Sequence, residues 1–215
     1  MNGSDMTDAH ADAMDAMYRY QRHIYDLTRK YYLFGRDGLI AGLDVPPGGS
    51  LLEVACGTGR NLKKAEALYP EARLYGFDIS EEMLASARGN FRNDAASFIA
   101  ADACRFKASD FGAEGFDRIM ISYALSMIPD WRRAVVAALD ALLPEGQLHV
   151  VDFGQQEKLP RAFRVVLRAW LARFHVHPRA EMMAVLAEEA GARGMTLAFH
   201  SVGGGYAWYA VLRRQ

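Results

Sequence analysis

The chain has 215 residues, of which 51% are hydrophobic, and its formal net charge is −1. These values predict one folded domain over residues 1–215, and they exclude a disordered chain and the strongly basic surface of a nucleic-acid binder. No run of about 18 apolar residues occurs, so we expect no helix that spans a bilayer. The two cysteines have no partner at metal-ligand spacing, which favours a reduced, cytosolic compartment and argues against a metal site.

The first 45 residues are predicted to form helices that cover a core made of residues 50–215. Helical periodicity runs from about residue 15 to residue 43, and the Pro-Pro-Gly-Gly sequence that follows ends it. Residues 18–37 contain five tyrosines, five basic residues and one histidine. This segment is either a surface helix whose tyrosines pack on the core, or a lid whose polar groups bind a carboxylate or phosphate. A loop at Gly35 is expected to present Arg36 inward.

Residues 50–59 predict a buried strand that ends in a glycine-rich turn and opens a helix. Gly57 and Gly59 let the backbone approach a ligand where a Cβ atom would clash. Glu53 lies near the end of this strand, where it can meet a polar and partly cationic ligand.

A second strand at residues 74–77 ends in Asp78, and an acid at this position typically binds ribose hydroxyl groups. The two strands together therefore predict a site for a nucleoside-containing cofactor. A dinucleotide fold needs a third glycine three residues after Gly59, but Arg-Asn-Leu stands there. An acid within the first strand also suits a pyrophosphate poorly, so the pattern argues against a dinucleotide.

Strand and helix patterns alternate from residue 50 to residue 153, which predicts a parallel sheet with helices on both faces. A glycine turn between two strand patterns near the end predicts an antiparallel hairpin. The later strands are expected near residue 98, at 116–122, after a turn at 143–148, at 196–202 and at 206–212. The helices are expected at 61–68, 81–88, 130–143, 158–176 and 179–190.

The order of these motifs resembles that of class I S-adenosylmethionine methyltransferases. The first motif is Glu53-x-Ala55-x-Gly57-x-Gly59, with Ala55 where a glycine is commoner, and similar matches follow at residues 78–84, 98–103, 116–122 and 143–148. The resemblance implies a Rossmann-like, seven-stranded, mostly parallel sheet and S-adenosylmethionine as cofactor. The cofactor-binding residues that it implies are Arg36, Glu53, Ala55, Cys56, Gly57, Gly59, Asp78, Ile79, Met83, Asp102, Ala103, Cys104 and Ser122.

A second, more restrictive resemblance lies in residues 25–37, Tyr-Asp-Leu-Thr-Arg-Lys-Tyr-Tyr-Leu-Phe-Gly-Arg-Asp, and in the ending at residues 203–210. Both are similar to the N-methyltransferases of betaine lipid synthesis. This resemblance implies three methylations of the amine of diacylglyceryl-homoserine, with S-adenosyl-L-homocysteine as the second product. It also implies an upstream partner enzyme that makes the homoserine lipid. It does not decide whether the chain forms a homo-oligomer.

The product of a third methylation is a quaternary ammonium, which aromatic faces stabilise by cation–π attraction. Tyr25, Tyr32 and Tyr123 are the candidate aromatic residues for this contact, and ordinary core packing is the alternative for each. Asp152, at the end of the fifth strand, could accept a hydrogen bond from the ammonium or cap a turn. Arg36 is the first choice for a carboxylate, either that of homoserine or that of the cofactor.

Residues 158–179 contain six basic residues and no acid. On a helical wheel the arginines at 161, 164 and 168 share one face, and the apolar residues at 163, 166, 167, 170, 171 and 174 share the opposite one. Such a helix is typical of a membrane surface, which would place the protein on the inner face of the membrane with its lipid substrate. The alternative is a surface helix that packs on the domain or on another subunit.

Three other functions remain as alternatives. The first is methylation of phosphatidylethanolamine or of a quinone precursor, and the second is a non-catalytic module that binds the cofactor or a membrane. The third, a nucleic-acid methyltransferase, would show an Asn/Asp-Pro-Pro-aromatic loop after the fourth strand. The sequence there is Ser-Tyr-Ala-Leu, so no nucleic-acid partner is expected.

Overall fold

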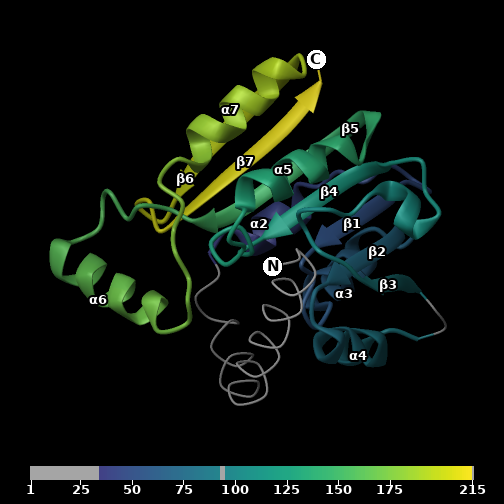
Figure 1. Cartoon of the computed structure of the whole chain (residues 1–215), viewed down its shortest axis with the longest axis horizontal. Helices are drawn as coiled ribbons and strands as arrows, with labels where there is room; N and C mark the ends of the chain where they lie inside the picture. Colours follow the sequence, from purple (N-terminus) through teal and green to yellow (C-terminus); the bar gives the residue numbers. More distant parts are fainter. Residues whose placement is uncertain (1–33, 93–94, 215) are drawn as a thin grey trace, which may run out of the picture.

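The computed structural model describes residues 34–92 and 95–214, which form a seven-stranded sheet with helices around it (Figure 1). The strands are β1 (Ser50–Val54), β2 (Arg73–Asp78), β3 (Ala96–Ala100), β4 (Phe116–Ser122), β5 (Leu142–Phe153), β6 (Met195–Val202) and β7 (Ala207–Arg214). The helices are α2 (Arg36–Ala41), α3 (Arg60–Leu68), α4 (Glu81–Asn90), α5 (Trp131–Asp140), α6 (Arg161–Ala172) and α7 (Met182–Ala192), with a short 3₁₀ helix, η1 (Ala108–Phe111).

The strand order is β3-β2-β1-β4-β5-β7-β6. Strands β1 to β5 run parallel, and β7 pairs antiparallel with β5 on one side and with β6 on the other. The predicted class, a mostly parallel seven-stranded sheet with a C-terminal antiparallel hairpin, is confirmed.

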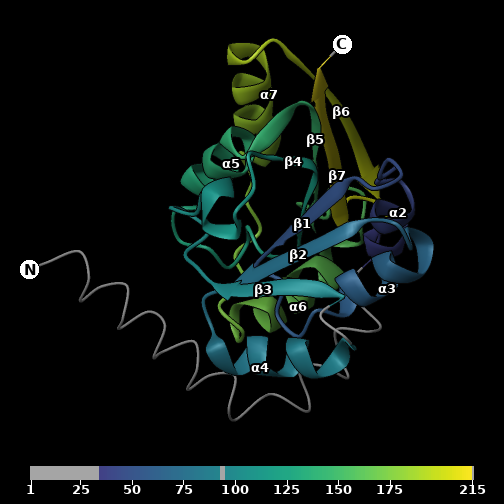
Figure 2. The ribbon, with the colours of Figure 1, turned by 90° about the vertical axis from the view of Figure 1, so that its right-hand side faces the viewer.

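Helices cover both faces of this sheet, as Figure 2 shows, with α5 and α7 on one side and α2 and α3 on the other. Alternation along the strands assigns each side chain to a face. Leu52 and Val54 of β1 belong to the same buried cluster as Trp131 of α5. Leu51 belongs to the other cluster, with Leu39 of α2 and residues of α3 and α4.

Two predicted helix boundaries are wrong in an informative way. The helix expected at 130–143 ends at Asp140, and β5 begins at Leu142. Pro144 explains this, because the residue before a proline is driven toward extended backbone. The periodicity predicted from about residue 15 to 43 is broken at Gly35, whose φ of 82° is left-handed, and only α2 follows. The rest of that segment, residues 1–33, lies outside the described residues.

The two helices after β5 are shorter or shifted relative to their predictions. The helix expected at 158–176 is α6, which begins after Pro160 and ends before a turn in which His175 has a φ of 55°. The helix expected at 179–190 is α7, which begins three residues later.

Candidate cofactor and acceptor site

The candidate site lies at the carboxyl ends of β1, β2 and β4. From β1 the chain runs outward to β2 and β3, and it then returns to place β4 on the other side of β1. In open parallel sheets, ligands bind at the strand ends where this reversal occurs. Val54 of β1 pairs with both Phe77 of β2 and Ile121 of β4, so the loops that follow these three strands begin side by side.

The turn after β1 has an unusual backbone conformation. Ala55, Gly57 and Gly59 all have positive φ, at 54°, 55° and 71°. A glycine adopts this conformation without cost, whereas an alanine is strained there. Ala55 therefore stands where the backbone itself favours glycine, which explains why glycine is the commoner residue in the motif.

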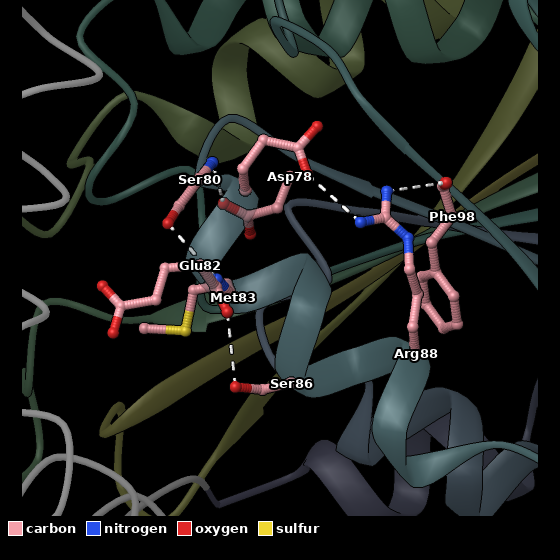
Figure 3. Close-up of polar contacts among 8 residues, drawn as sticks. Asp78, Ser80, Glu82, Met83, Ser86, Arg88 and Phe98 are labelled. Atoms are coloured by element: carbon pink, nitrogen blue, oxygen red, sulfur yellow. Dashed lines mark hydrogen bonds and ion pairs between the residues drawn. The ribbon is translucent and has the colours of Figure 1, made fainter.

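The Asp78 carboxylate connects this turn to the second strand. Its Oδ2 accepts a hydrogen bond from the Gly57 N–H at 2.8 Å, and its Oδ1 accepts one from the Ser80 N–H at 3.0 Å. Ser80 in turn caps α4, because its Oγ accepts from the Met83 N–H (Figure 3). Two backbone donors thus fix the carboxylate at the point where the second strand ends.

Glu53 is almost fully buried at the inner end of the site. Its Oε1 accepts a hydrogen bond from Asn61 Nδ2 of α3 at 2.6 Å. Asp102, two residues after β3, also accepts a hydrogen bond, from the Cys104 N–H to its Oδ1 at 2.8 Å. Asp102 therefore closes a tight turn and keeps its other oxygen toward Arg105, 3.9 Å away.

The remaining residues that were predicted to bind the cofactor differ in how far they are buried. Met83, Cys56 and Ala103 are buried, whereas Ile79 and Cys104 are partly exposed. Burial raises the pKa of both thiols, that of Cys104 to about 11, so both are neutral near pH 7. Neither is therefore an activated nucleophile.

The end of β4 carries a buried polar and aromatic cluster. Ser122 is buried, and its Oγ has no hydrogen-bond partner within residues 34–92 and 95–214. Tyr123 follows with a φ of 55°, and its hydroxyl donates to the Phe34 carbonyl. The Tyr123 ring packs edge-on against Phe153 at 4.7 Å, and Phe153 packs against Tyr206 at 5.9 Å.

Asp152 is completely enclosed on the opposite face of the sheet from this aromatic cluster. Its oxygens accept hydrogen bonds from the backbone N–H groups of Ser126 and Phe153. Burial raises the pKa of Asp152, and these hydrogen bonds and the charge of Arg179 oppose that rise. The contacts hold the loop after β4 against β5, so Asp152 is placed to position Tyr123 and its neighbours.

Arg36 begins α2, and its guanidinium lies 3.4 Å from the Asp37 carboxylate with little exposure of its side chain. Of the predicted site residues, those of β1, β2, β4 and the loops after them lie together in the structure. Tyr25 and Tyr32 lie outside the described residues. Sequence reasoning did not single out Asn61, Phe153 or Tyr206. Asn61 could have been found from its place in the first turn of the helix that follows Gly59.

The orphan Ser122 hydroxyl, the fixed Asp78 carboxylate and the left-handed turn fit a nucleoside cofactor. No group of three or more His, Cys, Asp or Glu side chains in the described part of the chain could hold a metal ion. Of the helices that the structure describes, none is long and apolar enough to cross a membrane.

Residues 51–146 match a protein family described as a methyltransferase domain. A demethylmenaquinone methyltransferase of Lactococcus lactis is 28% identical over 142 residues, which cover 66% of this chain and 53% of that protein. A trans-aconitate 2-methyltransferase of Variovorax paradoxus is 30% identical over 129 residues, which cover 60% and 48% of the two chains. The chain thus spans about half the length of the curated relatives it matches.

Solved structures share the fold over almost the whole chain. The plantazolicin methyltransferase in complex with a desmethyl analogue and SAH has a TM-score of 0.73 at 16% identity, covering 98% of this chain and 96% of that one. An S-adenosylmethionine-dependent methyltransferase from Mesorhizobium loti has a TM-score of 0.64 at 19% identity, covering 83% and 96%. This chain has the fold of the class I methyltransferases.

Proposed function

We propose that this protein is an S-adenosylmethionine-dependent N-methyltransferase that trimethylates the amine of diacylglyceryl-homoserine. The observation that carries the cofactor is the Asp78 carboxylate, fixed by Gly57 and Ser80 where the two cofactor strands end. The family match over residues 51–146 and the structural neighbours in complex with SAH support the same cofactor.

We assign a different part of the cofactor to each of the described residues. Asp78, held by the Gly57 N–H, would accept hydrogen bonds from the ribose, and Glu53, held by Asn61, would face the amino acid part of the cofactor. Ile79 and Met83 would contact adenine, and the turn closed by Asp102 would meet its amino group. When bound, S-adenosylmethionine supplies an activated methyl group that an unprotonated amine can displace from sulfur. The protein mainly aligns the acceptor and excludes water.

The acceptor is inferred from two features. The first is the signature at residues 25–37, which is far more restrictive than the cofactor motifs. The second is the cluster of Tyr123, Phe153 and Tyr206 beyond the end of β4. Aromatic faces suit an acceptor that becomes a quaternary ammonium. Arg36 is the cation that we assign to a carboxylate at this side of the site.

Mass spectrometry of lipids tests this proposal. The purified protein is incubated with S-adenosylmethionine and diacylglyceryl-homoserine, and gains of one, two and three methyl groups are expected. The Asp78→Asn variant under the same conditions controls for a contaminating activity. Binding of the cofactor without any methylated homoserine lipid would reject the substrate and retain the cofactor.

The second candidate is methylation of a quinone precursor, at carbon rather than nitrogen. The observation that favours it is the similarity to demethylmenaquinone methyltransferases, at 26–30% identity over about 60% of this chain. Demethylmenaquinone and phosphatidylethanolamine therefore belong in the same assay as competing acceptors. Conversion of demethylmenaquinone to menaquinone without methylated homoserine lipid would establish this alternative.

A further inference from the structure

We propose that the outer face of α6 is a docking surface for a membrane that carries anionic lipids. This inference deepens the proposed function, because a lipid acceptor must reach the protein from a bilayer. It corrects one expectation from the sequence, in which Val166 shared a single apolar face with Leu167 and Leu171.

The inner face of α6 is narrow. Leu167 and Leu171, one turn apart, are the buried residues of the helix, at 9% and 1% exposure. They belong to the same cluster as Tyr123, Phe153 and Tyr206. The buried side of the helix thus belongs to the same apolar cluster as the aromatic residues on the acceptor side of the candidate site.

The outer face of α6 is apolar where a surface helix would normally be polar. Val165 and Val166 are 60% and 68% exposed, and Ala162 and Ala169 continue the same strip one turn to each side. Phe163 is also half exposed, at 49%. In Figure 1, α6 lies beyond the sheet and apart from α5 and α7.

Basic residues surround the apolar strip. Arg161 and Arg168 lie along one side of it and Arg173 follows its C-terminal end, and all three are exposed. No acidic residue occurs between residues 158 and 180. An apolar strip with basic flanks and no acid has the charge and polarity of a helix that lies in a bilayer interface, with the arginines at the level of the phosphates.

Not every arginine in the segment is available for lipid. Arg168 donates to Gln156 Oε1 and to both the carbonyl and the side chain of Gln155, and so fastens α6 to the loop after β5. Arg179 donates to the carbonyls of Leu125 and Ile128. We therefore assign the lipid contact to Arg161 and Arg173, together with Lys158.

Cosedimentation with vesicles tests the surface without any methyl transfer. The full chain is mixed with vesicles of phosphatidylcholine alone and with vesicles that also contain phosphatidylglycerol, at low and high salt. We expect binding only to the anionic vesicles and weaker binding at high salt. The double variant Arg161→Gln, Arg173→Gln should lose roughly fivefold in affinity for each charge. The double variant Val165→Ser, Val166→Ser should lose roughly tenfold.

Matched controls come from exposed residues of other elements. Met183→Ser on α7 changes an exposed apolar residue, and Lys107→Gln with Arg214→Gln removes two exposed charges. These variants should bind like the parent. The proposal is overturned if the parent does not bind anionic vesicles, or if the α6 variants bind as well as the parent. A parent that sediments as a dimer, with a monomeric Val165→Ser, Val166→Ser variant, would instead assign the face to a second copy of the chain.

A water-soluble acceptor separates this inference from the proposed function. On glyceryl-homoserine without acyl chains, the α6 variants should methylate at the parent's rate, while on vesicles they should be slow. Vesicle binding without methylation of either acceptor would retain the docking surface and reject the proposed reaction. Methylation of both acceptors without vesicle binding would retain the proposed reaction and reject the docking surface.

Discussion

The Asp78 carboxylate accepts a hydrogen bond from the Gly57 N–H at 2.8 Å, although the two residues are 21 positions apart in the chain. This contact joins the turn after β1 to the end of β2. The residue that is expected to bind the ribose therefore also fixes the backbone that approaches the cofactor.

The substitution Asp78→Asn should weaken S-adenosylmethionine binding roughly a hundredfold, because a charged acceptor is lost and an amide N–H₂ group faces one of two backbone donors. Isothermal titration calorimetry measures the change. Asp140→Asn, at an exposed acid at the end of α5, is the control and should bind like the parent. An Asp78→Asn variant with the parent's affinity would move the cofactor site elsewhere.

Gly59 and Gly89 make a matched pair for testing the turn. Gly59 has a φ of 71°, and an added Cβ would lie 3.2 Å from Ala87 and Phe91, so Gly59→Ala should lower the free energy of unfolding by about 2 kcal/mol. Gly89 lies in α4 with open space around it, so Gly89→Ala should raise that free energy by about 0.5–1 kcal/mol. Urea titration of both variants checks the signs. Equal effects would mean that the turn conformation is not the one described.

His149 should make stability depend on pH. Burial, with the charges of Arg118 and Arg213, lowers the pKa of this residue to about 4. A lowered pKa means that the folded state favours neutral histidine. Its contribution is therefore complete above pH 6.5, the usual histidine value, and is lost as the pH falls through 4. The loss should reach about 3 kcal/mol of unfolding free energy.

The measurement is urea unfolding of the parent and of His149→Gln between pH 7 and pH 4. The difference between the two isolates His149 from Asp152, whose raised pKa acts in the opposite direction. The exposed Met183 of α7, which carries no titratable group, provides the control variant Met183→Gln, which should follow the parent. Parallel curves for His149→Gln and the parent would contradict the prediction.

Tyr123 offers a separate test of the acceptor side. Tyr123→Phe removes the donor to the Phe34 carbonyl and should cost about 1 kcal/mol of stability, while the ring keeps its packing on Phe153. If the ring faces the quaternary product, Tyr123→Phe should still yield trimethylated lipid, whereas Tyr123→Leu should accumulate the dimethylated form. Mass spectrometry of the products distinguishes the two. Equal product ratios would limit Tyr123 to a packing role.

The cofactor half of the site could be predicted from the sequence because its signals are local. The turn with Gly57 and Gly59 directly follows its strand, and Asp78 directly ends the next one. The strands of a parallel sheet place such ends at one edge, so their contact follows from the pattern. The assignment of individual binding roles stays a prediction.

The acceptor half could not be predicted in the same way. Phe153 and Tyr206 meet only because β7 inserts beside β5, and a periodic pattern does not show which strands are neighbours. The α6 helix is apolar on two faces, so a helical wheel does not decide which face meets the domain. Leu167 and Leu171 are buried against the domain and Trp170 packs partly beside them, whereas Val166, which the wheel grouped with them, is exposed.

The position of β7 between β5 and β6 also has a consequence for the order of folding during synthesis. In the part of the chain that the structure describes, β6 pairs only with β7, so it can join the sheet only after residues 207–214 have left the ribosome. Until then the hydrogen-bonding edge of β5 is open, which exposes it to pairing with other chains. The strands that hold the cofactor motifs, β1 to β4, are complete well before that moment. A ligand that binds them early could therefore protect the nascent protein from aggregation.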